Sequence, residues 1–328
     1  MAIGRQYLAL GFLVITLAAP VAAFAQSQGR VPSIGLLMPE SPSVEAPRVD
    51  ALRAGLREYG YVERKNIGVE IRSADGSYDR LPALAAQLVA DKVDVIVVFG
   101  TKAISAAMHA TATIPIVDPV MGDPVAFGAA STLARPGGNV TGSVQFSPEA
   151  GAKRLELLKQ AFPRVARVAV LVNPRNAGSS LQLQTMRATA GALKLDLQVL
   201  EVDDAAGLGP AFSTIAQGRF DALVVPTDSL FRANAVDIAR RVAMQKLPSI
   251  GSREFAVAGG LMGYGPDANE LYRHAAYFVD RILKGARPAD LPIERATKLD
   301  FVINLKAAGA AGITIPDAML VRANEVIR

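Results

Sequence analysis

Short apolar runs alternate with helical patterns along most of the chain. The run at 93–99 (VDVIVVF) is apolar almost throughout, which is typical of a parallel strand buried on both faces. In the segment 46–59, apolar residues recur at helical spacing and predict a helix with one buried face. We expect strands at 33–38, 67–73, 93–99, 114–117, 139–144, 167–172, 197–202, 222–225 and 248–250. We expect helices at 46–59, 80–90, 102–110, 149–162, 179–193, 205–217 and 233–246.

This alternation predicts an α/β fold with parallel sheets and right-handed crossovers. Two runs of about five strands each indicate two similar lobes rather than one sheet of about ten strands. If each lobe takes one strand and one helix from the tail, the chain crosses between the lobes three times and forms a hinge. The expected lobes are 31–145 plus about 255–285, and 146–254 plus about 290–328. The tail contains an expected strand at 261–264, helix at 268–284, loop at 285–292, strand at 299–303 and helices at 305–311 and 318–327.

Residues 1–25 have the pattern of a secretory signal peptide. Arg5 supplies the positive start, an apolar run continues to Pro20, and Ala23 and Ala25 are the small residues of a cleavage site. The run is too short for a comfortable membrane span, so an uncleaved anchor is the weaker interpretation. We therefore expect cleavage after Ala25 and a periplasmic mature protein.

The composition narrows the function classes. The 328 residues are 51% hydrophobic and 20% charged, which excludes disorder as the main state. Cysteine is absent, which removes disulfides, thiolate metal sites and a cysteine nucleophile. The only histidines, His109 and His274, are too few for a multi-histidine centre, so we expect no metal and no cofactor. The net charge of +5 comes from scattered basic residues, which favours a surface of mixed sign over nucleic-acid binding.

Polar residues just after the predicted strands are the site candidates, because ligands of open parallel sheets bind beyond the carboxyl ends of the strands. The first lobe offers Ser41 after its first strand, Thr101 after the third, and Asp118 and Asp123 after the fourth. Thr101 lies at an expected helix start, where it serves as an N-cap or as part of an anion site. Asp123 has the alternative of capping a helix.

The second lobe offers Asn173 and Asp228 after two buried strands, and Glu254 and Tyr264 at expected crossings. Asp228 either caps the next helix or presents its carboxylate to a ligand ammonium. Together with the helix start at Thr101, this carboxylate would suit a zwitterion. The absence of Trp counts against a sugar ligand.

Catalytic and nucleotide-binding motifs are absent from the sequence. It has no GxxxxGK(S/T), no GxGxxG after a strand and no GxSxG. Both histidines fall within expected helices, so a Ser-His-Asp triad has no support. We expect a binding protein that is not an enzyme, and an exported α/β enzyme is the alternative from another class.

Six segments, in this order, resemble the ABC transporter substrate-binding protein family that includes the TrpX-type aromatic amino-acid binders. The resemblance runs from about residue 31 to the C-terminus. The segments are LREYGYVERKNIGVEIRSADGSYDRLPALAAQLV, IPIVDPVMGDPVAFGAASTLARPGGNVTG, GAKRLELLKQAFPRVARVAVLVNPRN, REFAVAGGLMGYG, RILKGARPADLPIE and DFVINLKAAGAAGITIP.

The resemblance implies a type I periplasmic binding protein, with two Rossmann-like lobes, a three-segment hinge and a ligand trapped in the cleft. The Pro-Thr-Asp at 226–228 matches a family segment whose Asp binds the ligand's amino group in TrpX-type members. The Gly-Thr at 100–101 also matches, although Lys102 replaces a usual small residue. The loop after the first strand has Ser41 and Ser43 but lacks the family's Asn.

By the same resemblance, the expected function is the solute-binding component of an ABC importer. Its partners would be a small organic ligand, meaning an amino acid or other small carboxylate, and an ABC permease with its cytoplasmic ATPase. An extracytoplasmic sensor serving a receptor is the alternative with the same fold. The sequence shows no heptad or other assembly signal, so we expect a monomer.

Overall fold

The computed structural model describes residues 30–145, 148–176 and 178–328. Residues 32–328 form one compact unit. The predicted signal peptide at 1–25 lies outside the described residues. Within the described ranges, no helix combines the length and the apolar character that a membrane crossing requires.

The first sheet has six strands in the order β11-β5-β4-β3-β1-β2, and its pairs are parallel. β3 (Val95–Val98) lies inside the sheet with every residue buried, as its continuous apolar pattern predicts. The other strands are β1 (Ser33–Met38), β2 (Gly68–Ser73), β4 (Ile116–Met121), β5 (Val140–Val144) and β11 (Glu294–Arg295).

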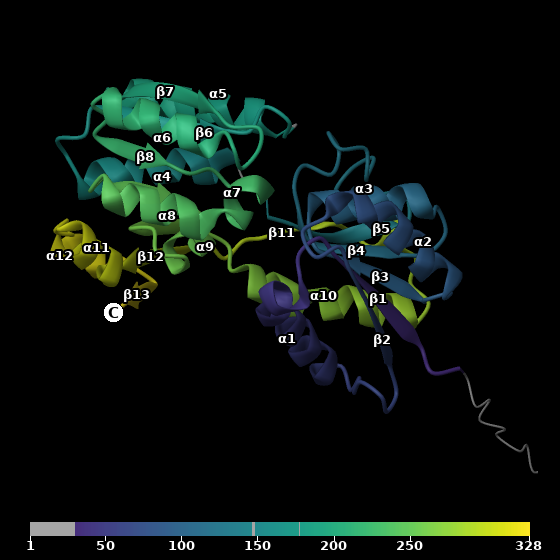
Figure 1. Cartoon of the computed structure of the whole chain (residues 1–328). Helices are drawn as coiled ribbons and strands as arrows, with labels where there is room; N and C mark the ends of the chain where they lie inside the picture. Colours follow the sequence, from purple (N-terminus) through teal and green to yellow (C-terminus); the bar gives the residue numbers. More distant parts are fainter. Residues whose placement is uncertain (1–29, 146–147, 177) are drawn as a thin grey trace, which may run out of the picture. The chain divides into compact units, whose positions relative to one another are not determined.

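Helices cover both faces of this sheet (Figure 1). On one face, α2 and α3 enclose a core that contains Leu88 and Ile104. On the other face, α1 and α10 enclose a core that contains Leu52 and Phe278. The helices are α1 (Pro42–Glu58), η1 (Tyr78–Arg80), α2 (Leu81–Ala90), α3 (Thr101–Ala110), α10 (Ala268–Leu283) and η2 (Pro288–Asp290).

The second sheet has seven strands in the order β13-β12-β10-β9-β8-β6-β7. β10 and β12 are antiparallel, whereas its other pairs are parallel. The strands are β6 (Arg167–Val172), β7 (Asp196–Glu201), β8 (Ala222–Val224), β9 (Ser249–Gly251), β10 (Met262–Gly265), β12 (Asp300–Asn304) and β13 (Glu325–Ile327).

The second sheet also has a core on each face. Leu155 of α4 and Met186 of α5 belong to one core, and Phe212 of α6 and Ile238 of α8 belong to the other. The helices are α4 (Pro148–Ala161), α5 (Ser179–Ala192), α6 (Leu208–Gln217), α7 (Ser229–Ala233), α8 (Ala235–Met244), α9 (Arg253–Val257), α11 (Leu305–Ala311) and α12 (Asp317–Leu320).

The chain passes between the two sheets three times: after β5, between β10 and α10, and between β11 and β12. Two details of the predicted lobe boundaries are wrong. β10 falls in the stretch 255–285 expected with the first lobe, but it pairs with β9 and β12. β11 falls in the stretch from 290 expected with the second lobe, but it pairs with β5. We therefore propose lobes of 32–145 with 268–295, and of 148–265 with 300–328.

The predicted terminal helix at 318–327 is also wrong. α12 ends at Leu320, and the chain then forms β13 beside β12. The Asn324 backbone N–H donates to the Phe301 carbonyl at 2.8 Å, and the Asn324 side chain accepts from the Phe301 N–H at 2.8 Å. Hydrogen bonds to a neighbouring strand outweigh the local helical pattern here.

Several helix boundaries differ from the prediction. The helix expected at 233–246 is α8, which begins at Ala235, and it is preceded by the short helix α7, which was not predicted. The short helix α9 after β9 was not predicted, and its N-cap Ser252 accepts from the Phe255 N–H. α1 begins at Pro42 rather than at 46, since proline suits the first turn of a helix.

Candidate functional site

Asp228 and Asn173 lie together at the carboxyl edge of the second sheet. Asn173 follows β6, Asp228 follows β8, and these strands are neighbours. The Asn173 Nδ2 donates to both Asp228 carboxylate oxygens, at 3.2 and 3.3 Å. The Asn176 Nδ2 donates to Asp228 Oδ2 at 2.6 Å. The structure thus brings two predicted residues into direct contact and adds Asn176, which lies three residues after Asn173 in the same segment.

Asp228 also caps the following helix, so both interpretations of this residue have structural support. Its Oδ1 accepts from the Leu230 backbone N–H at 2.7 Å. The side chain is 8% exposed, and no lysine or arginine of the described chain forms an ion pair with it. A buried carboxylate held only by neutral donors lacks the positive partner that usually accompanies a buried charge.

A small recess opens beside this cluster, between the ends of β6 and β8 and helix α5. Its walls are mainly apolar, with Val172, Leu183 and Met186 among them, and Asn173 and Asp228 supply polar groups. The space inside it that can hold water-sized molecules is about 10 Å³, roughly one water molecule. Small-molecule sites usually measure about 300–1,000 Å³, so the recess in this conformation is too small for an amino-acid side chain.

Arg154 of α4 holds the neighbouring backbone. Its Nη2 donates to Thr227 Oγ1 at 2.7 Å, and its Nε and Nη2 donate to the Tyr264 carbonyl at 2.9 and 2.7 Å. The side chain is fully buried, and burial lowers the pKa of the guanidinium to about 10 although Glu254 and Tyr264 oppose this shift. Arg154 was not predicted, but it lies one turn from buried Leu158, so helical spacing could have placed it on the buried face.

Tyr264 and Glu254, both predicted at crossings, lie near this arginine. Tyr264 contributes its backbone carbonyl, while its ring packs against the core of the second sheet. The Oε1 atom of Glu254 is buried and has no hydrogen-bond partner among the described residues. Their roles toward a ligand stay predictions.

The predicted site residues of the first lobe do not form one cluster as Asn173 and Asp228 do. Asp123 accepts from the backbone N–H groups of Val125 and Ala126, at 3.0 and 3.1 Å, which is the capping alternative. Ser41 precedes α1, and its hydroxyl contacts that of Ser43 at 2.9 Å. Thr101 begins α3, where Gly100 occupies the N-cap position, and the Thr101 side chain lies outside the described part of the structure.

Asp118 lies within β4 rather than beyond it, and its side chain is 1% exposed. Its Oδ1 accepts from the Val120 N–H at 2.9 Å, whereas Oδ2 has no partner among the described residues. Burial raises the pKa of this carboxyl to about 7, although the Val120 hydrogen bond acts in the opposite direction. Its contact with a ligand stays a prediction.

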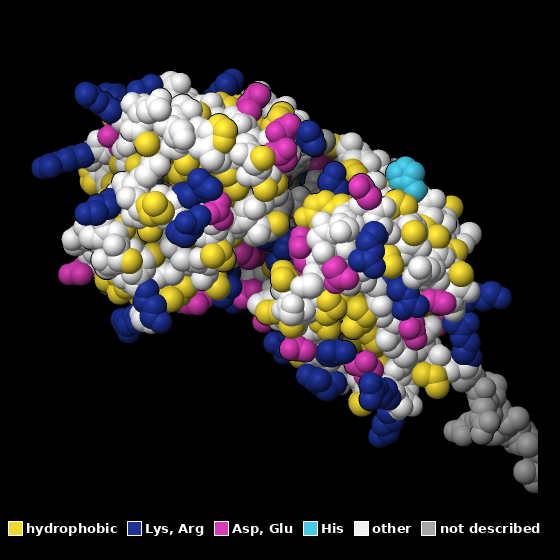
Figure 2. All heavy atoms as spheres, viewed as in Figure 1, with side chains coloured by type: hydrophobic (Ala, Val, Ile, Leu, Met, Phe, Trp, Pro, Cys, Tyr) yellow, Lys and Arg dark blue, Asp and Glu magenta, His cyan; other side chains and the backbone are white. Residues whose placement is uncertain are grey.

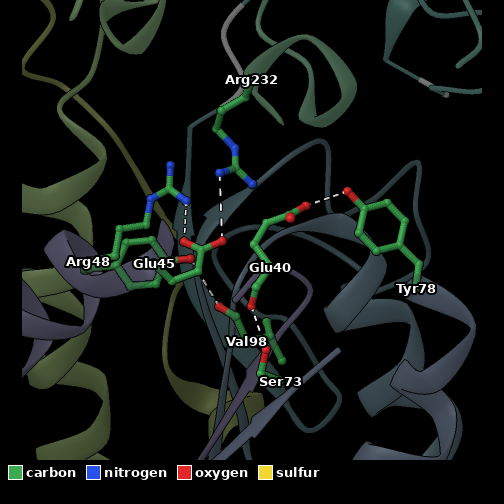
Figure 3. Close-up of polar contacts among 8 residues, drawn as sticks. Glu40, Glu45, Arg48, Ser73, Tyr78, Val98 and Arg232 are labelled. Carbon is green, nitrogen blue, oxygen red and sulfur yellow. Dashed lines mark hydrogen bonds and ion pairs between the residues drawn. The ribbon is translucent and has the colours of Figure 1, made fainter. Parts of the chain in front are cut away.

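A second polar cluster, missed by sequence analysis, joins the two edges (Figure 3). Glu45 of α1 is fully buried, and its Oε2 accepts from Arg48 Nη1 at 2.6 Å. Arg232 of α7 approaches Glu45 Oε1, with 3.9 Å between the nitrogen and the oxygen. Tyr78 donates its hydroxyl to Glu40 at 2.6 Å, and burial together with this bond raises the pKa of Tyr78 to about 12.

Charged side chains elsewhere do not gather by sign on the face drawn in Figure 2. Basic and acidic groups are interspersed there, in the mixed pattern that the scattered charges of the sequence predict. The polar clusters around Asp228 and Glu45 are therefore distinguished by burial, not by a surrounding field of one sign.

Comparison with known proteins identifies the family. The model of the ABC transporter substrate binding protein family matches residues 36–327. A tyrosine-binding protein of Clostridioides difficile (strain R20291) is 27% identical over 293 residues, which cover 87% of this chain and 84% of the relative.

Solved structures agree with this assignment. The ABC domain from Streptococcus pneumoniae in complex with L-Trp is 26% identical, with a TM-score of 0.83 over 91% of this chain and 100% of that one. A conserved domain protein from Vibrio cholerae is 29% identical, with a TM-score of 0.82 over 90% of this chain and 100% of that one. The chain therefore belongs to the ABC transporter substrate-binding protein family and has the two-lobed α/β fold of a type I periplasmic binding protein.

Proposed function

We propose that this protein is the periplasmic solute-binding component of an ABC importer and that it binds a free amino acid. It would pass this ligand to a membrane permease that is powered by a separate ATPase. The observation that carries the ligand class is the Asp228 carboxylate, which is buried beside Asn173 and Asn176 and forms no ion pair with the described residues. The signal-peptide pattern of residues 1–25 supports export.

The Asp228 cluster is suited to an ammonium group. Both amides donate to the carboxylate and so hold it in one orientation. An ammonium would add the missing positive charge, and charge-assisted hydrogen bonds are the strong ones. Asp228 therefore favours a ligand with an amino group over a neutral sugar or a simple acid.

Two relatives that are more than 25% identical to this chain have a ligand in their names, and they support an aromatic ligand. They are a tyrosine-binding protein, 27% identical, and a protein in complex with L-Trp, 26% identical. We therefore propose that aromatic amino acids are the first candidates.

A thermal-shift screen of residues 26–328 tests this proposal. The protein should be unfolded and refolded first, so that any co-purified ligand is removed. An amino acid at about 100 times its dissociation constant should stabilise the fold by about 2.7 kcal/mol, whereas sugars and nucleosides should have no effect. A shift only with ligands that lack an amino group would contradict the proposal.

Asp228→Asn should weaken amino-acid binding by about 2–4 kcal/mol, because a buried ammonium would lose its charged partner. Asn is as good an N-cap as Asp, so the start of α7 should survive the substitution. The matched control is Asp317→Asn on the exposed first turn of α12, which should bind with unchanged affinity. Calorimetric titration measures the affinity of both variants. If Asp228→Asn binds as tightly as the wild type, Asp228 does not bind the ligand's ammonium group.

A further inference from the structure

Arg232 extends from the second lobe to the first. It lies on α7, and its backbone N–H donates to the Asp228 carbonyl at 2.9 Å. Its guanidinium points toward the loops that follow β1 and β3 (Figure 3). Arg232 Nη2 would lie 3.9 Å from a Cβ atom built on Gly100, at the start of α3. This single side chain thus reaches both sheet edges.

The Arg232 guanidinium has unused hydrogen-bonding capacity. The side chain is only 24% exposed, yet its five N–H donors make no hydrogen bond to the described residues. The nearest anion is Glu45 Oε1 at 3.9 Å, which is too far for a hydrogen bond. A guanidinium on a largely covered side chain usually has hydrogen-bond partners, so this one lacks acceptors for its N–H groups.

The two neighbouring carboxylates, Glu45 and Glu40, do not supply these acceptors. Glu45 already pairs with Arg48 through a 2.6 Å contact, and its remaining oxygen is buried without a hydrogen bond to any described residue. Glu40 turns its carboxylate toward the Tyr78 hydroxyl (Figure 3). Arg232 therefore remains a cation whose planar fork is free to take a carboxylate in two parallel hydrogen bonds.

We propose that Arg232 binds the carboxylate of the ligand, an inference that rests on the proposed amino-acid function. Asp228 is the N-cap of α7 and Arg232 lies one helical turn later, so their side chains project from neighbouring positions. The amino group and carboxylate of an α-amino acid are likewise adjacent. One turn of helix would then recognise both charges of the zwitterion.

Calorimetry with two pairs of probes tests this role. L-Tyrosine and L-tryptophan carry the carboxylate, and tyramine and tryptamine have the same side chains and amino group without it. Arg232→Gln should weaken binding of the two amino acids by at least about 30-fold. It should leave the binding of the two amines unchanged. The affinity of Arg232→Lys for the two amino acids should lie between those of wild type and Arg232→Gln, because lysine keeps the charge but loses the planar fork.

The control is Arg240→Gln on α8, whose side chain is 63% exposed and pairs with Asp237. It should bind all four probes like the wild type, and the unliganded melting temperatures of the variants show whether each is folded. Two results would overturn the role of Arg232 but leave the proposed function standing. One is that folded Arg232→Gln binds L-tyrosine and L-tryptophan with wild-type affinity, and the other is that it loses equal affinity for amino acids and amines. A wild-type protein that binds neither amino acid would overturn the proposed function as well.

Discussion

At the scale of single residues, Asp118 shows how burial alters the chemistry of one carboxyl group. It is enclosed in β4, where Oδ1 accepts from Val120 and Oδ2 has no hydrogen bond to the described residues. Burial disfavours the charged form and raises the pKa from 3.8 to about 7. The folded protein therefore retains a proton on Asp118 at pH values where the unfolded chain has released it.

This difference predicts a pH-dependent stability. Between about pH 4 and pH 7, the folded state binds more protons at Asp118 than the unfolded state, so the free energy of unfolding falls as pH rises. The contribution declines by up to about 1.4 kcal/mol per pH unit and is constant above the folded pKa. Urea unfolding at pH 5 and pH 8 measures it.

Asp118→Asn isolates the contribution of this carboxyl, because the amide oxygen can still accept from Val120 but does not titrate. The loss of stability between pH 5 and pH 8 should be smaller in the variant than in the wild type. An identical pH dependence in both proteins would show that Asp118 is ionised in the folded state or does not titrate in this range.

At the scale of elements, α1 and α10 pack closely because Gly55 has no side chain. A Cβ atom at Gly55 would overlap the backbone carbonyl of Arg273 and would lie 2.9 Å from the Cβ atom of Ala276. The obstacle is backbone, which cannot rotate away as a side chain would. The spacing of the two helices therefore depends on this glycine.

Gly55→Ala should destabilise the fold by about 1–3 kcal/mol through overpacking, despite the better helix propensity of alanine. The control is Gly309→Ala in α11, where a Cβ atom meets nothing within 4 Å. That variant should be stabilised by about 0.5–1 kcal/mol. Urea midpoints measure both, and a neutral Gly55→Ala would contradict the close packing.

Elements with their own apolar pattern could be predicted from the sequence, and elements defined by a partner could not. β3 is buried on both faces, so its pattern is complete within the strand. β11 consists of two exposed residues, Glu294 and Arg295, and is a strand only through its pairing with β5. β13 likewise depends on β12, which is why a helix was predicted there.

The same distinction applies to the site. Asn173 and Asp228 follow buried strands, so the general rule for parallel sheets located both of them. Arg154 lies within a helix whose spacing indicates its burial, but its partners Thr227 and Tyr264 are far along the chain. Glu45 also lies within a helix, and its approach to Arg232 joins segments that are far apart in the sequence. The position of Arg232 near Glu45 results from the approach of two separate sheet edges, which no local sequence pattern predicts.

At the scale of the whole molecule, the family assignment and the three crossings between sheets agree with a binding protein built from two lobes. Each sheet edge carries one of the two polar clusters. Asp228 lies with Asn173 and Asn176 on one edge, and Glu45 lies with Arg48 on the other. We propose that Asp228 and its two amide neighbours select a ligand by its amino group.

The most direct test is calorimetric titration of the refolded wild-type protein with L-tyrosine and with 3-(4-hydroxyphenyl)propionate, which lacks the amino group. L-Tyrosine should bind at least about tenfold more tightly, because only it can pair with Asp228. Equal or tighter binding of the propionate would show that the ligand's amino group contributes nothing to its recognition.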